Sequence, residues 1–435
     1  MSPAANMFRT LTLTALVSAV VSAYESQVPL NPQFPEYLNE EWDDSCSISK
    51  STAYDVHDGP NTFSSSPSED IHSVKISPHV NATNWEQWEF DGLSHTGLSG
   101  LLMAFSRDAT YAFFGQGNLR VEFYITLGDG SIIQELDFIS ESYVIDCPDF
   151  TAGIWNSTDR SYSFYVTKDH QFARLKFDSW RVRGGFTMSS STRPHLADGS
   201  PWTPDGGKPD ATEVSPGLFY GLSMGGAEVD VDATLSSGKR ITFKGRGGST
   251  RLWATEGWLK LCDGWKVIRA WAGPYSIVYW DVLSRIDRGV RYVSGHLFYH
   301  DELLVGSRVG QPSDKADYVL FNDQFDGEMS GKYKDKNTGH HLEFASPARD
   351  KKWTFDVQHI VTQYEIGAGA GFGMSGFANR VVGGEVGGVQ YEGKGQSEQT
   401  YWPEHIEEWK IWLVWGLGFL GRGKTYVMKL VGYVL

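Results

Sequence analysis

Short runs of alternating apolar and polar residues, separated by Gly- and Asp-containing turns, recur along most of the chain from Trp85 onward. The run Leu119–Ile125, for example, is followed by the turn Gly128–Gly130 and by a second run, Ile132–Phe138. A period of two places successive side chains on opposite faces of a β-strand. Many short strands with few helical stretches are typical of β-sandwiches and β-barrels, so we expect an all-β protein. Further predicted strands are Tyr162–Val166, Arg174–Phe177, Glu228–Ala233, Val267–Trp271, Ser276–Val282 and Trp353–Val361.

Changes in composition divide the chain into four parts. Residues 1–23 read as a signal peptide, because Arg9 precedes an apolar stretch and small residues follow it. Residues 24–80, rich in Ser, Pro, Asn and Asp, read as an extended arm. A glycine-rich run at 245–248 then separates an N-terminal β-domain, residues 81–246, from a C-terminal β-domain, residues 247–435.

Three segments depart from the strand pattern. Residues 192–217 contain five prolines and predict a long loop, and residues 367–376 predict a glycine-dense, mobile loop. Pro403, with acidic residues behind it, predicts the start of a C-terminal helix. Its apolar part spans only ten residues, 411–420, so we expect a packed helix and no stable membrane insertion.

If the chain enters the secretory pathway, its sequons can be glycosylated and its cysteines can form a disulfide. Asn81 and Asn156 are glycosylation acceptors. In an oxidising compartment two of the three cysteines can pair. We favour Cys46 with Cys147, because Cys46 lies in a polar arm that needs tying down. Cys262 lies in an apolar run, where a buried free thiol is expected.

Bulk composition narrows the class of partner. The formal net charge of −15 argues against binding to a nucleic-acid backbone, which requires a basic face. Aromatic residues make up 14% of the chain, and such rings line pockets for flat, apolar ligands as well as cores. The sequence does not give the oligomeric state.

Two glycine motifs lack the context that their chemistry needs. The run Gly221–Gly225 matches the nucleophile elbow of serine hydrolases, but a predicted strand, Glu228–Ala233, follows where a helix is required. The run Gly371–Gly376 matches a dinucleotide fingerprint, but no βαβ pattern surrounds it. We therefore expect neither a serine hydrolase nor a nucleotide cofactor.

A histidine-containing strand offers only a weak metal site. His296, His300 and Glu302 share one face of a predicted strand, but neighbours two apart on a strand are ~7 Å apart, and nothing in the sequence completes a ligand set. We expect no metal there. His340 and His341 point to opposite faces, and we expect both to be solvated.

The segment Trp85–Gly92 is unusual because it mixes carboxylates with large aromatics. On a strand, Glu86, Trp88 and Phe90 share one face, whereas Trp85, Gln87, Glu89 and Asp91 share the other. Glu86 is either a pocket group with a raised pKa, able to act as an acid, or a structural carboxylate bonded to a neighbouring amide or an Arg. The pattern alone leaves both readings open.

At this point the sequence resembles the fungal lipocalin-like Diels–Alderases, relatives of carotenoid-hydratase-like proteins. The resemblance follows the chain in order from about residue 85 to residue 395. The motifs that carry it are Trp85–Gly92, Gly153–Trp155, Arg251–Trp253, Gly273–Tyr275, Gly331–Gly339 followed by Glu343–Phe344, Trp353 with His359, and Tyr391–Gly393.

The resemblance implies two lipocalin-like lobes of β-barrel or β-sandwich type, a substrate cavity, and pericyclic chemistry on small apolar polyenes without a cofactor. It implies Glu86, Asp91 and His359 as candidate catalytic groups. The residues that it implies as substrate-binding are Trp88, Phe90, Trp253, Tyr275 and Trp353.

The signal peptide, sequons and long arm resemble a narrower subgroup, hetero-Diels–Alderases that join a tropolone-derived quinone methide to humulene-type sesquiterpenes. The alternatives are an intramolecular, decalin-forming Diels–Alderase, a polyene hydratase or isomerase, and a non-catalytic carrier of an apolar metabolite. Carrier and enzyme share the same cavity and aromatics, so the sequence does not separate them.

Overall fold

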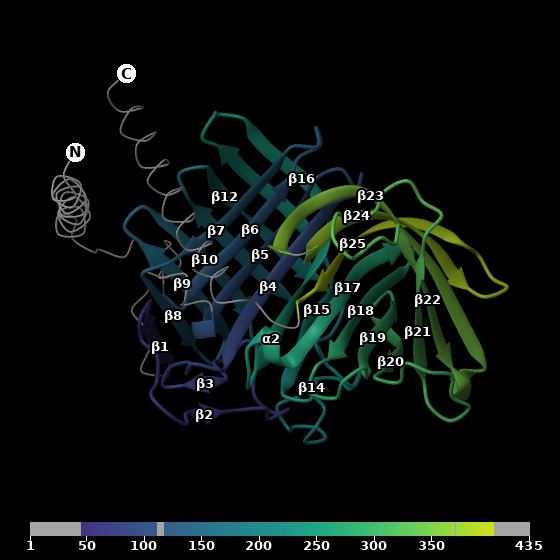
Figure 1. Ribbon diagram of the computed structural model, residues 1–435, viewed down its shortest axis with the longest axis horizontal. Helices are drawn as coiled ribbons and strands as arrows, with labels where there is room; N and C mark the ends of the chain where they lie inside the picture. Colours follow the sequence, from purple (N-terminus) through teal and green to yellow (C-terminus); the bar gives the residue numbers. More distant parts are fainter. Residues whose placement is uncertain (1–44, 111–116, 370, 404–435) are drawn as a thin grey trace, which may run out of the picture.

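Two large antiparallel β-sheets make up the protein in the computed structural model, which describes residues 45–110, 117–369 and 371–403 (Figure 1). The expected all-β class with two lobes is confirmed. The predicted signal peptide and C-terminal helix lie outside the described residues. Within the described part, no helix is long and apolar enough to span a membrane.

The first sheet has fourteen strands and curls into a half-barrel. Its main path runs in the order β1-β8-β9-β10-β11-β12-β15-β16-β4-β5-β6-β7, and β13 and β14 pair with β15. Its strands are β1 (Ser47–Thr52), β4 (Trp85–Ser94), β5 (Gly100–Asp108), β6 (Leu119–Thr126), β7 (Ile132–Phe138), β8 (Glu141–Asp146), β9 (Phe150–Ser157), β10 (Arg160–Thr167), β11 (Phe172–Asp178), β12 (Val182–Ser190), β13 (His195–Leu196), β14 (Glu213–Ser215), β15 (Leu218–Leu235) and β16 (Arg240–Ala254).

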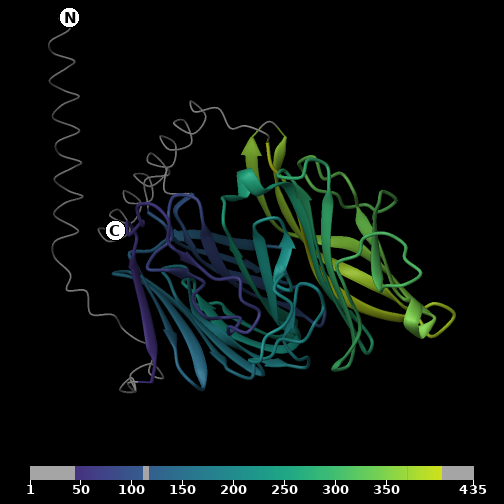
Figure 2. The ribbon, with the colours of Figure 1, turned by 90° about the horizontal axis from the view of Figure 1, so that it is seen from below.

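The second sheet has nine strands in the order β20-β19-β18-β17-β25-β24-β23-β22-β21 and forms a nearly closed barrel (Figure 2). Its strands are β17 (Cys262–Ala272), β18 (Tyr275–Ser284), β19 (Arg291–Tyr299), β20 (Glu302–Ser307), β21 (Tyr318–Gln324), β22 (Gly339–Ser346), β23 (Lys351–Gly369), β24 (Phe372–Glu385) and β25 (Tyr391–Tyr401). A short helix, α2 (Trp258–Leu261), joins β16 to β17, and a 3₁₀ turn, η3 (Pro347–Arg349), precedes β23. A small hairpin of β2 (Thr62–Phe63) and β3 (Ile76–Ser77) stands apart from both sheets.

The passage between the sheets lies later in the chain than the predicted boundary. β16 continues through residues 246 and 247 and ends at Ala254, and the second sheet begins at Cys262. The described part of the arm is also ordered, because β1 pairs with β8 at the edge of the first sheet.

Alternating apolar side chains build the three largest apolar cores of the described residues. One fills the half-barrel and contains Trp88 and Phe90, and another fills the second barrel around Phe355. The third contains residues of both sheets, among them Trp85 and Trp280, so the two sheets also pack against each other. Burial of apolar surface of this kind is the main force that holds the two lobes together.

Two segments predicted as loops contain paired strands. Within the predicted mobile loop 367–376, β23 ends and β24 begins, and the two strands pair up to Gly369 and Phe372. Alternation cannot show a strand where glycines replace the side chains, which explains the error. The predicted loop 192–217 contains β13 and β14, which both pair with β15.

The predicted disulfide between Cys46 and Cys147 is confirmed, and it ties the start of the described arm to the turn after β8. Cys262 is a free, fully buried thiol. Glycosylation was predicted at Asn81 and Asn156. Asn156 is only 6% exposed within β9, which is a poor place for a glycan, whereas Asn81 is partly exposed.

Alkylation in denaturant without reductant is therefore expected to label one cysteine, Cys262, and alkylation after reduction is expected to label all three. The native protein should take up no label, because burial raises the pKa of the Cys262 thiol and shields it. Mass spectrometry of the labelled peptides measures this. Labelling of Cys46 or Cys147 without reductant would contradict the bridge.

Candidate active site

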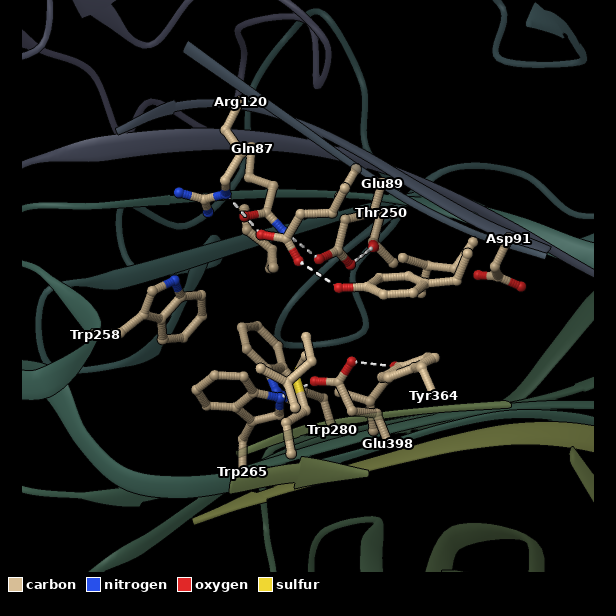
Figure 3. Close-up of a pocket in the computed structure, with 18 of the residues that line it drawn as sticks. Gln87, Glu89, Asp91, Arg120, Thr250, Trp258, Trp265, Trp280, Tyr364 and Glu398 are labelled. Atoms are coloured by element: carbon tan, nitrogen blue, oxygen red, sulfur yellow. Dashed lines mark hydrogen bonds and ion pairs between the residues drawn. The ribbon is translucent and has the colours of Figure 1, made fainter. Parts of the chain in front are cut away.

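A cavity of about 820 Å³ lies between the two sheets (Figure 3). Strands β4, β5, β6 and β16 of the first sheet form one wall, and β17, β18, β23, β24 and β25 of the second sheet form the other. Residues 256–260, which include most of α2, close one end. The volume is within the range of ~300–1,000 Å³ that is typical of small-molecule sites.

Strand alternation decides which side chains of β4 reach this cavity. Gln87, Glu89 and Asp91 line it, whereas Trp88 and Phe90 point into the half-barrel core. The predicted division of Trp85–Gly92 into two faces is therefore correct. The face that borders the cavity is the one opposite to Glu86.

Four indoles, from Trp258, Trp265, Trp280 and Trp402, give the cavity an aromatic surface. The rings of Trp258 and Trp265 lie 4.5 Å apart between centroids, and Trp265 lies 5.8 Å from Trp402. Trp280 packs against Tyr220, another lining residue, at 5.1 Å. Such a surface suits a flat, unsaturated chain.

Glu89 is a partly buried carboxyl group on the opposite wall (Figure 3). The Gln87 side-chain amide donates to one of its oxygens, and the Thr250 hydroxyl donates to the other at 3.0 Å. Burial, together with the nearby charge of Glu398, raises the pKa of Glu89 to about 8. Glu89 is therefore mostly neutral near pH 7 and carries a proton that it can donate in a hydrogen bond.

Glu398 faces Glu89 from β25. It accepts hydrogen bonds from the Tyr364 hydroxyl and the Trp265 indole N–H, and burial raises its pKa as well. The ring of Tyr364 stacks on Tyr124 of the first sheet at 4.4 Å. The polar part of the cavity is thus built by both sheets.

Asp91, a predicted catalytic residue, does line the cavity but is held in an ion pair. Its Oδ2 lies 2.7 Å from Nε of Arg269, which comes from β17 of the other sheet. Burial raises the pKa of the Asp91 carboxyl, and the Arg269 charge opposes that rise.

Glu86, by contrast, lies on the far side of the first sheet and is fully buried. Its Oε2 accepts hydrogen bonds from Arg251 Nη2 at 2.6 Å and from the backbone N–H of Lys75 at 3.0 Å, and Arg107 Nη1 lies 3.6 Å from its Oε1. The Trp88 indole donates to the carbonyl of His72 at 2.9 Å. A part of the N-terminal arm therefore covers the face on which a substrate was expected.

The other predicted site residues lie in three further places. Tyr275 and Trp353 line a separate pocket of about 540 Å³ in the second barrel, and Trp253 donates to the carbonyl of Ser64 in the arm at 2.9 Å. His359 lies inside the second barrel, where its Nδ1 is 2.7 Å from Oδ1 of Asn379. Burial lowers the pKa of His359 to about 3, so it stays neutral. None of these four residues lines the larger cavity.

The residues considered and rejected as metal ligands from the sequence do not converge in the structure. A turn at His300 separates β19 from β20, so the single strand expected there is wrong. His296 Nε2 bonds the carbonyl of Leu196, and Glu302 pairs with Arg349. Among the described residues, no group of three or more His, Cys, Asp or Glu side chains is placed to hold a metal ion.

The structure also tests the predicted exposure of His340 and His341 and the elbow-like motif at Ser223. His340 is fully buried, with its Nδ1 3.2 Å from Asp323, so the expectation that it is solvated is wrong, whereas His341 is partly exposed. Ser223 of the elbow-like motif is buried within β15, where its hydroxyl lies 2.7 Å from Nε2 of His72 and 2.9 Å from Nδ1 of His170. No sharp strand-to-helix turn presents this hydroxyl, as the sequence context indicated.

Sequence reasoning missed Glu89, Glu398 and the indoles of Trp265 and Trp280. Glu89 had a usable signal, because it lies on the same predicted face as Asp91. The others lie on neighbouring strands of the second sheet, and only the meeting of the two sheets places them opposite Glu89.

Comparisons with known proteins identify Diels-Alderase-like proteins and cyclases as relatives. A family model described as Diels-Alderase-like matches residues 43–403. The hexane cyclase pydB of Acremonium sp is 81% identical over 425 residues and covers 98% of each chain. The hexane cyclase gkaB of Penicillium citrinum is 48% identical and covers 99% of this chain and 100% of its own.

A further relative and a solved structure also match. The Diels-Alderase mycB of Thermothelomyces thermophilus is 46% identical over 89% of each chain. The crystal structure of CghA with Sch210972 superposes with a TM-score of 0.74, covering 83% of this chain and 100% of that one at 24% identity.

Proposed function

Because the chain belongs to the Diels-Alderase-like family, we propose that it is a cofactor-independent cyclase that closes a six-membered carbon ring by cycloaddition within a polyene-bearing substrate. The observation that carries this proposal is a cavity with an aromatic surface and a partly buried, neutral carboxyl group, that of Glu89. The word hexane in the names of pydB and gkaB favours a ring of six carbon atoms. The narrower reading, addition of a quinone methide to a sesquiterpene, would instead place oxygen in the new ring.

A concerted cycloaddition makes few demands beyond shape. No proton or group is transferred, so the enzyme needs mainly to hold diene and dienophile in a folded, reactive geometry. Holding reacting atoms ~3–3.5 Å apart lowers a barrier by ~7–11 kcal/mol in favourable cases. The indoles of Trp258, Trp265 and Trp280 offer flat surfaces against which a polyene folds.

Glu89 supplies the polar part of the catalysis. In its neutral form it donates a hydrogen bond to a carbonyl conjugated with the dienophile and so draws electron density from the reacting double bond. A donor fixed in place before the reaction stabilises the charge that develops in the transition state. Gln87 and Thr250 hold the carboxyl group in position.

Incubation of the purified protein with a linear polyenyl substrate tests this function. We expect ring closure faster than in buffer alone, with one diastereomer in excess and without incorporation of oxygen from labelled water. Oxygen incorporation would identify a hydratase. Binding of the substrate without any gain in rate would identify a carrier.

Raising the pH through about 8 is expected to lower kcat/KM by about tenfold per pH unit, because the Glu89 carboxyl then loses the proton that it donates. Below pH 8 the neutral form prevails, so the rate should be level. Glu89→Gln retains an N–H donor and should show no such fall. Rates measured from about pH 6 to pH 10 check both profiles, and an identical fall in the two proteins would remove Glu89 from the mechanism.

The secretory pathway is our proposal for where the protein folds. The Cys46–Cys147 disulfide supports it, because such bridges persist in oxidising compartments. Sequencing of the mature N-terminus tests it, and a chain that keeps residues 1–23 would contradict cleavage of a signal peptide.

A further inference from the structure

We propose that Asp91 and Arg269 are positioning residues whose ion pair fixes the separation of the two sheets, and thereby the folded shape in which the substrate reacts. This inference rests on the proposed function. We call Asp91, Arg269 and the groups that hold them the inter-sheet lock. This inference gives Asp91 a role different from the catalytic one that the family resemblance implies.

The geometry of the lock is that of a bridge between sheets. Arg269 Nε donates to Asp91 Oδ2 at 2.7 Å, and Arg269 Nη1 donates to the carbonyl of Met224 at 2.8 Å. Asp91 and Met224 belong to β4 and β15 of the first sheet, whereas Arg269 belongs to β17 of the second. Both charged side chains are largely buried, at 15% and 9% exposed for Asp91 and Arg269.

Local features of the first sheet make room for the guanidinium group. β15 has an irregular register between Leu222 and Ala227, and a carbonyl in that stretch accepts from Arg269. A Cβ atom at Gly248 would lie 2.1 Å from Arg269 Nη1. Glycine at 248 is thus needed for the arginine to reach across, and the irregular stretch supplies its acceptor.

A further hydrogen bond joins the two sheets close to the lock. The Gln396 side-chain amide donates to the carbonyl of Gly92 at 3.1 Å, next to Asp91 on β4. Asp91 and Trp258 appear at opposite ends of the view of the cavity in Figure 3. Because the lock joins the sheets at the cavity in which the substrate reacts, a small change in the lock alters the distance between the two walls of the cavity.

Energetics favour a positioning role over a stabilising one. A buried ion pair gains little net stability, since desolvation offsets the attraction, but it fixes a geometry that apolar packing alone leaves adjustable. Cavity width in turn decides which folded conformer of a flexible polyene fits. Displacement of a reacting group by 1 Å costs on the order of 100-fold in rate.

An Asp–Arg ion pair between the two lobes, away from the cavity, provides a matched control. Arg308 on the second lobe pairs with Asp210 on the first at 2.8 Å and also donates to the carbonyl of Glu213, but Asp210 is 60% exposed and none of the three lines the cavity. Arg308→Lys and Asp210→Asn therefore repeat the chemistry of Arg269→Lys and Asp91→Asn at a contact between the lobes that lies away from the site.

The experiment compares these four variants by kcat, KM and the ratio of product diastereomers. Arg269→Lys and Asp91→Asn should lower kcat by about 10- to 100-fold and shift the product ratio toward that of the spontaneous reaction, with KM changed less than about threefold. The two control variants should keep the wild-type ratio. A wild-type kcat and ratio in folded Arg269→Lys or Asp91→Asn would overturn the lock.

Binding of an environment-sensitive apolar dye gives a readout that needs no turnover. A rigid dye cannot adapt to a changed spacing of the walls as a flexible polyene can, so both lock variants should change the affinity for the dye by at least about threefold, while the controls should not. If the wild type binds the dye but forms no ring, the proposed function fails while the lock is still tested. Asp91→Asn keeps the size of the side chain and one oxygen acceptor but removes the charge, so it serves if Arg269→Lys does not fold, and unchanged dye binding in it would count against the lock.

Discussion

Glu86→Gln is expected to lower the free energy of unfolding by about 3–5 kcal/mol, because it removes a carboxylate that lies against two buried guanidinium groups. Arg251 is 0% exposed and Arg107 2%, and both lie against Glu86. Gln keeps the size of the side chain but not the charge. An uncompensated buried cation is far more costly than a lost surface contact.

Urea unfolding followed by tryptophan fluorescence measures this change. Glu302→Gln is the matched control, because Glu302 pairs with Arg349 at 3.0 Å on the surface and should change stability by less than about 1 kcal/mol. A fully stable Glu86→Gln protein with greatly reduced turnover would contradict the structural role. It would restore the alternative in which Glu86 is an acid at the substrate.

Glu89→Leu is expected to lower kcat by roughly 100-fold, because it removes a preorganised donor from the wall of the cavity. The substitution fills a similar volume and abolishes a partly buried ionisable group, so the protein should remain folded. Glu89→Gln should stay within about fivefold of the wild type, since its amide still donates. Single-turnover rates on the same substrate, with thermal melting as the folding control, measure both variants.

A stable Glu89→Leu protein with wild-type turnover would contradict this role. Catalysis would then rest on the shape of the cavity alone. The proposed function would survive that result, but the pH profile expected from Glu89 would not.

Much of the fold was readable from the sequence, because alternation and turns act locally. Ile132–Phe138 is both the predicted run and the observed strand β7, and the pairing of Cys46 with Cys147 followed from the polar character of the arm. The family was also identified correctly, since its motifs follow one another along the chain. These features depend on order along the sequence and not on which surfaces meet.

The residues of the candidate site were predicted less accurately, because they depend on what covers each face of a strand. Alternation separated Glu86 from Glu89 correctly, but no local pattern shows that residues near His72 cover the Glu86 side. Tyr275 and Trp353 carry family motifs yet line a different pocket. Glu398 and Trp265 stand in no motif, and they face Glu89 only because two sheets formed by distant segments pack together.

A crystal structure with the cyclised product, or with an unreactive analogue of the linear substrate, tests the central claim most directly. The account predicts ligand density between the two sheets, against Trp265 and Trp280, with a carbonyl oxygen within hydrogen-bond distance of Glu89. Density in the pocket lined by Tyr275 and Trp353, or on the Glu86 face of the first sheet, would contradict it.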